Sequence, residues 1–310
     1  MRVIGGEIEC KFNESVYYTD SGRSSLRVFL RNFRNKKILL PDFLCEVVVN
    51  TLESENIKYE FYHINEDLSI DENTIKNKIF DILYIINYFG VLQNLSLNLD
   101  DKIVIEDNVF FYKFENRGFK NWFGFNSYRK ISELADGSLI KTNLDIILNK
   151  NNGNEFSDFK YQAKDKKFDV IYKKQGNEEE YLNLFNKGEK YLDESKSIGN
   201  ISDKSIYLLS LFDYRKSQNI RKKRFDILYK EVGKFCINKN PKEYSFFVIK
   251  IKNRDIFREK LFSKQIFLPI HWPKSFINNI LYDEIISIPL FENYNDVEFE
   301  YLVNSIKEVL

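Results

Sequence analysis

Residues 125–137 read Phe125-Asn126-Ser127-Tyr128-Arg129-Lys130-Ile131-Ser132-Glu133-Leu134-Ala135-Asp136-Gly137, a Ser/Gly-flanked loop pattern with one central lysine. An apolar run, Ile103-Val104-Ile105, comes before it and leads into Glu106, Asp107 and Asn108. Because Lys and Arg together number 47, a lysine alone carries no information here. The order and spacing of Lys130 and Asp107 carry the signal.

These two side chains are the groups that pyridoxal phosphate (PLP) requires. The cofactor needs a lysine amine for its aldehyde and an acid for its ring nitrogen. Such a lysine must be partly unprotonated, and burial beside a cation such as Arg129 lowers the pKa of an amine. Taken singly, Lys130 is a typical surface lysine and Asp107 a typical capping residue. Taken together, they favour PLP as cofactor, with Lys130 and Asp107 as catalytic residues.

A phosphate site is indicated where the first predicted helix begins. Ser21-Gly22-Arg23-Ser24-Ser25 combines hydroxyls, a glycine, an arginine and free backbone N–H groups, which suit an anion at a helix N-terminus. The same residues would also serve as an ordinary helix cap. Ser127 could bond the same phosphate, and Asp136-Gly137 predicts a tight turn that lets backbone approach a ligand.

The bulk composition limits partners and location. The formal net charge is +1, so no global field favours nucleic acid or insertion into an anionic membrane. No apolar run reaches the roughly 18–20 residues of a membrane helix, and Met1–Glu7 turns acidic too early for a secretory signal. Cys10, Cys45 and Cys236 are irregularly spaced, and only two histidines are present. We therefore expect a cytoplasmic protein without a metal site or disulfide framework.

The order of predicted elements indicates an α/β fold. A helix over 21–34 is followed by strands at 38–41, 59–62, 82–86 and 103–105, with a further helix at 47–52, as in a mainly parallel sheet flanked by helices. Residues 144–200 turn polar and are predicted to form loops and short surface helices. Beyond a helical stretch at 203–235, a strand at 246–251, a helix at 255–263, a strand at 285–289 and a helix at 296–309 predict a smaller C-terminal α/β domain. We place the large domain at 1–215 and the small one at 216–310.

Several short motifs, in order, resemble the DegT/DnrJ/EryC1/StrS sugar aminotransferases, which are PLP enzymes of fold type I. The resemblance covers the chain from about residue 17 to its end, and the Arg-Lys pair of the lysine loop is similar to a divergent branch with a Ser-x-Arg-Lys pattern. The motifs are Ser21-Gly22-Arg23-Ser24-Ser25-Leu26, Leu39-Leu40-Pro41, Tyr88-Phe89-Gly90, Ile105-Glu106-Asp107-Asn108, Ser127-Tyr128-Arg129-Lys130 with Asp136-Gly137, and Ser287-Ile288-Pro289.

The resemblance implies a role for each matched residue. Lys130 would bind the cofactor covalently and move a proton between two carbons, and Asp107 would pair with the pyridinium. At the substrate we place Tyr88, Arg129 and His271, although His271 could equally pack within its loop. The remaining cofactor contacts would come from Ser21, Gly22, Arg23, Ser24, Phe110 and Ser127.

The resemblance also implies the reaction: transfer of an amino group, usually from glutamate, to a keto-sugar carried by a nucleotide diphosphate, for surface polysaccharide or glycoconjugate biosynthesis. The enzyme would be a homodimer with its site at the subunit interface. Two positions depart from the family. Phe110 stands where the family has His or Gln, and Asp213 lies near the place of an asparagine that reaches the neighbouring subunit's phosphate. These departures keep an alternative open: a non-catalytic homologue that binds PLP or a sugar nucleotide in regulation or assembly.

Overall fold

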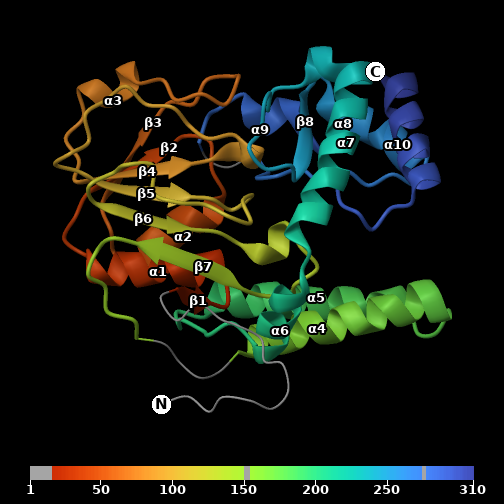
Figure 1. The fold of residues 1–310 in the computed structure, drawn as a ribbon, viewed down its shortest axis with the longest axis horizontal. Coiled ribbons are helices and arrows are strands. Elements are labelled where there is room, and N and C mark those ends of the chain that lie inside the picture. Colours follow the sequence, from red (N-terminus) through yellow and green to blue (C-terminus); the bar gives the residue numbers. More distant parts are fainter. Residues whose placement is uncertain (1–15, 150–153, 274–276) are drawn as a thin grey trace.

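The computed structural model describes residues 16–149, 154–273 and 277–310. The N-terminal residues Met1–Glu7 and Cys10, and residues 150–153 of the polar stretch, lie outside the described parts. Figure 1 shows the arrangement: a large sheet with its helices, a smaller domain beside it, and a pair of long helices that run past both.

The large sheet has seven strands in the order β1-β7-β6-β5-β4-β2-β3. Strands β2 to β6 pair in parallel, whereas β7 is antiparallel to both β6 and β1. Every residue of β4 is buried, which agrees with the continuous apolar run in its sequence. The strands are β1 (Tyr17–Thr19), β2 (Ile38–Pro41), β3 (Tyr59–Tyr62), β4 (Ile82–Ile86), β5 (Ile103–Asp107), β6 (Trp122–Phe125) and β7 (Ser138–Thr142).

Helices α1 (Gly22–Asn32) and α2 (Glu46–Ser54) lie together along the sheet in Figure 1. Leu26, Phe29 and Leu30 recur at helical spacing and are all buried. The Phe29 ring lies 5.1 Å from the ring of Phe123 in β6, which fixes α1 against the sheet. The predicted α/β order of the first 140 residues is therefore confirmed, with a short helix α3 (Asn73–Lys76) added.

The prediction of loops and short helices for 144–200 is wrong. Helices α4 (Glu155–Phe168) and α5 (Glu178–Glu194) pack side by side as a long hairpin, joined through the π-helical turn η3 (Asp169–Lys173). Each begins at an asparagine, Asn154 or Asn177, whose side chain accepts the amide hydrogen three residues on. The hairpin is attached at its base because Asp136 accepts hydrogen bonds from Asn154 Nδ2 at 2.7 Å and from Ser202 N at 2.8 Å.

The small domain contains an antiparallel pair, β8 (Phe246–Lys250) and β9 (Ile285–Pro289). Its own core includes Leu228, Phe247, Ile286 and Ile306. The predicted strand–helix–strand–helix order is confirmed, whereas the boundary at 215/216 remains a prediction. Helix α6 (Asp203–Leu211) leads into the domain, whose helices are α7 (Tyr214–Val232), α8 (Arg254–Phe262), α9 (Leu281–Glu284) and α10 (Asp296–Val309). The chain also contains short 3-10 turns: η1 (Tyr88–Gly90) and η2 (Tyr128–Lys130) between strands of the large sheet, and η4 (Gly233–Phe235) after α7. No helix in the described ranges combines the length and apolarity needed to cross a membrane.

The two domains meet at Gly90. The Gly90 carbonyl accepts from Lys242 N at 2.7 Å, and the Gly90 backbone has a positive φ of 85°. The Glu243 carboxylate reaches back to the large domain, accepting from Tyr112 N at 2.6 Å and Lys113 N at 2.8 Å. The small domain is thus hydrogen-bonded to the end of β4 and to the loop that follows β5.

A glycine is required at this joint, so Gly90→Ala should destabilise the protein. A Cβ on Gly90 would lie 1.8 Å from the Glu243 carbonyl oxygen, whereas one on Gly118, which also has a positive φ, would meet nothing within 4 Å. Gly118→Ala should lower the free energy of unfolding only by the backbone strain, about 1–2 kcal/mol. Gly90→Ala should lower it by the same strain and by a further amount of about 1–3 kcal/mol, because the added methyl group overpacks the joint. Urea unfolding, followed by circular dichroism, measures the free energy of unfolding of both variants. Equal losses of stability would contradict the role of the close contact between Gly90 and the Glu243 carbonyl.

Candidate active site

The carboxyl ends of three parallel strands surround one cavity of about 210 Å³. Ile86, Asp107 and Phe125 are the last residues of β4, β5 and β6, and all three line it. Ligands of open α/β sheets bind at this edge. The full lining comprises Ser21, Gly22, Arg23, Leu26, Cys45, Val47, Val48, Thr51, Tyr84, Ile86, Asp107, Val109, Phe125, Ser127, Arg129, Lys130, Glu189, Leu192 and Trp272.

Asp107 is a buried carboxylate held in a fixed orientation. Its Oδ2 accepts from the Tyr84 hydroxyl at 2.7 Å, and its Oδ1 accepts from Val109 N at 3.0 Å. Burial raises the pKa of Asp107 to about 6, against the two hydrogen bonds, which act to lower it. At neutral pH the group is therefore ionised, and it would gain from a cationic partner in the cavity.

Lys130 ends the turn η2, and its amine stands in the cavity. Its backbone N–H donates to Ser127 O at 3.0 Å, which closes the turn and directs the residue. Within the described ranges Nζ makes no hydrogen bond and no ion pair. Protein atoms surround the amine, although the open cavity leaves the side chain accessible to solvent. The charge of Arg129 and, after it, burial lower the pKa of Lys130 to about 8. A tenth or so of the amine is then neutral at pH 7.

The start of α1 presents unpaired N–H groups at the cavity. Ser21 caps the helix, its Oγ accepting from Ser24 N at 3.2 Å, whereas the amides of Gly22 and Arg23 have no acceptor within the described part of the chain. The Arg23 Nε atom is buried and also lacks a partner. Three unpaired donors at a positive helix end suit a phosphate group. Ser21, Gly22 and Arg23, the residues of the predicted phosphate site, lie together on the cavity, and Ser127 lines it as well.

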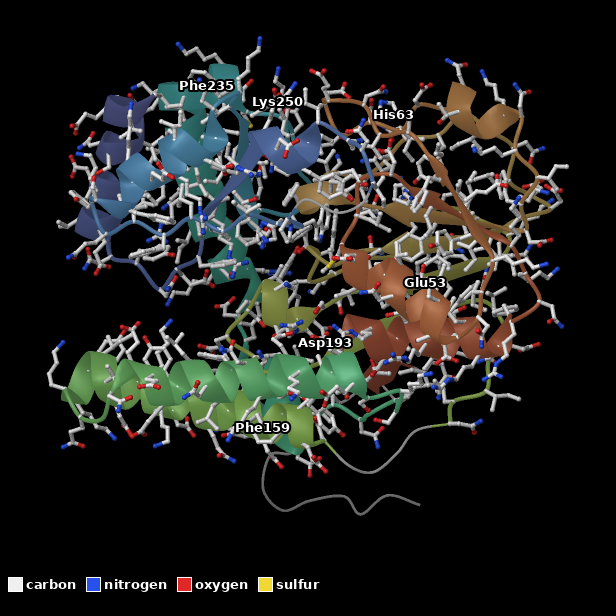
Figure 2. The ribbon with its side chains drawn as sticks, turned by 180° about the vertical axis from the view of Figure 1, so that it is seen from behind. Glu53, His63, Phe159, Asp193, Phe235 and Lys250 are labelled. Atoms are coloured by element: carbon white, nitrogen blue, oxygen red, sulfur yellow. The ribbon has the colours of Figure 1, made fainter. Side chains whose placement is uncertain are left out.

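Helix α5 forms a wall that the sequence did not indicate. Glu189 lines the cavity and receives hydrogen bonds from Arg129 at 2.8 and 3.4 Å. One turn later Asp193 forms an ion pair with Arg23 at 2.8 Å, and Figure 2 shows Asp193 on α5 beside the start of α1. Both arginines of the cavity are thus paired with carboxylates from the hairpin. A prediction of loops and short surface helices for this segment gives no indication of these contacts.

Four of the predicted site residues do not line the cavity. Tyr88 is fully buried, donates its hydroxyl to the Phe43 carbonyl and packs against the Phe43 ring. Phe110 stacks on Phe89 at 4.6 Å between ring centroids and is 1% exposed. The other two are Ser24, which is buried in α1, and His271.

The neighbours of two of these residues line the cavity in their place. Val109 faces it rather than Phe110, because the Asp107–Val109 hydrogen bond turns the chain after β5. Trp272 faces it rather than His271, whose Nδ1 lies 2.8 Å from Ser287 Oγ. Burial, with a smaller effect of the Lys130 charge, lowers the pKa of His271 to about 3, so the ring is neutral. The predicted ring contact by Phe110 and the substrate contacts by Tyr88 and His271 are therefore not supported by this geometry.

A larger hollow of about 650 Å³ opens between the segment after η2, α4 and α7. Its buried cation, Arg221, is already paired with Glu292 at 2.9 Å, and Lys130 does not reach it. In the described ranges no group of three or more His, Cys, Asp or Glu side chains is placed to hold a metal ion. The smaller cavity is therefore the candidate active site, since it alone of the two joins an unpaired amine, a buried carboxylate and an anion site.

Comparison with known proteins places this geometry in a known fold. No family model and no curated protein matches the chain. Among solved structures, it is similar to the sugar aminotransferase CalS13 from Micromonospora echinospora, with 12% identity, a TM-score of 0.62 and coverage of 95% of this chain and 87% of that one. A DegT DnrJ EryC1 StrS aminotransferase from Brucella abortus is 12% identical, with a TM-score of 0.59 and coverage of 94% of this chain and 85% of that one. The putative sugar aminotransferase Spr1654 from Streptococcus pneumoniae, in its PLP-form, is 13% identical, with a TM-score of 0.64 and coverage of 95% and 86%. At these identities the likeness shows a shared fold, which confirms the predicted fold class.

The hydrogen bond from Tyr84 lowers the pKa of Asp107, so Tyr84→Phe should raise that pKa above about 6. We expect a rise of about 0.5–1 pH unit, because one of two bonds to the charged form is lost. Carbon-detected NMR of aspartate carboxyls, with the Asp107 signal assigned through Asp107→Asn, measures the change. Tyr62→Phe is the matched control, since the buried Tyr62 hydroxyl donates to the Tyr84 carbonyl instead. An unchanged titration in Tyr84→Phe would contradict the assigned bond.

Proposed function

We propose that this protein is a PLP-dependent aminotransferase that converts a keto-sugar carried by a nucleotide diphosphate into an amino-sugar. The observation that carries the proposal is the grouping of three features around one cavity. These are the unpaired Lys130 amine, the buried Asp107 carboxylate and the unpaired donors at the start of α1. The shared fold with sugar aminotransferases supports the same assignment.

The residues present fit the cofactor. Asp107 would hold the ring nitrogen, and the Gly22 and Arg23 amides with Arg23 Nε would hold the phosphate. Val109 and Trp272 supply apolar surface for the ring. When bound, PLP supplies an electron-accepting ring that stabilises a carbanion next to the reacting nitrogen.

The chain's own groups would then perform the acid–base work. Lys130, with its pKa lowered to about 8, has enough neutral amine at pH 7 to react with an aldehyde and to carry a proton between two carbons. Asp107, ionised above about pH 6, would keep the ring nitrogen protonated. Arg129, whose buried Nε lacks a partner, would attract anionic groups of the substrate.

The size of the cavity bears on the substrate. At about 210 Å³ it is smaller than the roughly 300–1,000 Å³ of sites that enclose drug-sized ligands, so it suits the cofactor and the reacting end of a substrate. The nucleotide would then lie outside it, which accords with a homodimer whose second subunit completes the site. Glutamate as amino donor, a cytoplasmic location and a role in surface polysaccharide or glycoconjugate biosynthesis belong to the same proposal.

One observation favours the alternative of a non-catalytic binding protein. Both cavity arginines, Arg23 and Arg129, are already paired with carboxylates of α5, and these ion pairs compete with phosphate and with anionic substrates. In that case the protein would bind PLP or a sugar nucleotide without turning over an amino donor.

Reduction on Lys130 tests the cofactor assignment. The purified protein with PLP should absorb in the visible range, and borohydride should fix the cofactor on the peptide that contains Lys130. Lys130→Ala should abolish both signals. Lys120→Ala, an exposed lysine paired with Asp100, should keep them. Protein that stays colourless with added PLP would contradict the proposal.

The amino donor separates the enzyme from the binding protein. Glutamate added to the coloured holoprotein should bleach the visible band and release one 2-oxoglutarate per site, because the amino group passes to the cofactor. A coloured protein that glutamate and other amino acids leave unchanged would support the non-catalytic alternative.

The affinity for the cofactor should depend on the ionisation of Asp107. Because burial raises the pKa of Asp107 to about 6 in the empty site, the carboxylate is ionised at pH 7 and mostly protonated at pH 5. The ratio of wild-type to Asp107→Asn affinity for pyridoxamine phosphate should therefore fall about tenfold from pH 7 to pH 5. Fluorescence titration measures the affinity of each protein. Ionisation of the ligand phosphate affects both affinities equally, so it cancels in the ratio. A ratio that stays constant over this range would contradict a role for the Asp107 charge.

A further inference from the structure

Glu189 is the residue of α5 that faces the lysine loop most directly. Its Oε1 accepts from Arg129 Nη1 at 2.8 Å, and its Oε2 accepts from Nη2 at 3.4 Å. The same carboxylate receives Lys160 Nζ of α4 at 2.5 Å. The charges of Arg129 and Lys160 outweigh the effect of burial and lower the pKa of Glu189 to about 2, so it is ionised at any working pH.

Arg129 has few other contacts that could fix it. Its guanidinium lies 5.6 Å from the centre of the Phe156 ring, and its buried Nε has no hydrogen-bond partner among the residues that the structure describes. The bidentate pair with Glu189 is therefore the interaction that sets the position of the guanidinium. Since Arg129 directly precedes Lys130 in η2, that position also sets how close a positive charge stands to the Lys130 amine.

The Lys130 amine is surrounded by charged and titratable groups from several elements. Arg129 has the largest influence on its protonation, and Glu189 and Lys160 act on it with opposite signs. Loss of the Glu189 carboxylate would therefore increase the excess of positive charge near the amine. The groups that face this part of the cavity are Arg23 from α1, Cys45 before α2, Asp107 from β5, Arg129 from η2, Lys160 from α4, Glu189 from α5 and His271 beside Trp272.

We propose that Glu189 is a positioning residue that holds Arg129 beside Lys130 and balances its positive charge, and so sets the protonation of the catalytic amine. This inference rests on the role proposed for Lys130 and assigns a part of the site to the α4–α5 hairpin. Too little positive charge would leave the amine fully protonated and unreactive. Too much would leave it unable to hold the proton that it must carry between two carbons.

The proposal predicts the direction of change for two variants. Glu189→Gln keeps a hydrogen-bond acceptor for Arg129 but removes the negative charge, so the pKa of Lys130 should fall from about 8 by about 0.5–1 pH unit. Arg129→Gln removes the largest lowering influence, so the pKa should rise toward that of an ordinary lysine. In the double variant Glu189→Gln should still lower the pKa of Lys130, because the Glu189 charge acts on the amine directly as well as on Arg129.

Competitive labelling measures the protonation of the Lys130 amine directly. The full chain, freed of cofactor, is treated with trace acetic anhydride between pH 6 and pH 11, and acetylation of Lys130 is quantified by mass spectrometry against the exposed Lys120. At pH 6, below the pKa, labelling of Lys130 in Glu189→Gln should be about three- to tenfold faster than in the wild type. Glu194→Gln is the matched control, because Glu194 is exposed on the same helix and, among the described residues, pairs only with Lys190.

Two results would overturn the proposal. One is a Lys130 titration in Glu189→Gln that coincides with that of Glu194→Gln. The other is a Lys130 pKa in Arg129→Gln that does not rise above that of the wild type. Circular dichroism and thermal melting establish that each variant is folded. The labelling reads the ionisation of Lys130 whether or not PLP binds, so its outcome is independent of the borohydride experiment that tests the cofactor.

Discussion

Parallel pairing of β4, β5 and β6 is the constraint on which the site depends. The register sets Ile86 opposite Asp107 and Asp107 opposite Phe125, so the three strands end at one level. A carboxylate at the last position of the central strand is then enclosed by its neighbours and withdrawn from water. Its raised pKa, its bond with Tyr84 and the room left above it all follow from this alignment.

The main chemical groups could be predicted because each is encoded within a few residues. Three patterns are local: a strand of buried apolar residues that ends in Asp107, a helix that starts at Ser21-Gly22, and a lysine in a loop flanked by serine and glycine. The structure brings all three to one cavity. The order of strands and helices in both domains follows from similarly local patterns of burial.

The remaining features depend on contacts between distant parts of the chain. The α4–α5 hairpin is mostly polar, and it is held by Asp136 at its base and by the Lys160–Glu189 pair between its helices. Both contacts join residues far apart in the sequence, so the polar pattern of the segment predicts only loops and short surface helices. Val109 and Trp272 were missed for a different reason. Each stands next to a residue that was chosen, and the direction of a side chain at a loop depends on hydrogen bonds such as that from Val109 N to Asp107.

The joint at Gly90 has a mechanical consequence. Val109 N is bonded to Asp107, and the Trp272 ring packs against Phe43 and Tyr88 of the large domain. Both walls of the cavity therefore stay with the sheet edge that carries Asp107 if the small domain shifts as a rigid body. The strain of such a shift falls on the joint instead, where Gly90 and Glu243 hydrogen-bond the two domains.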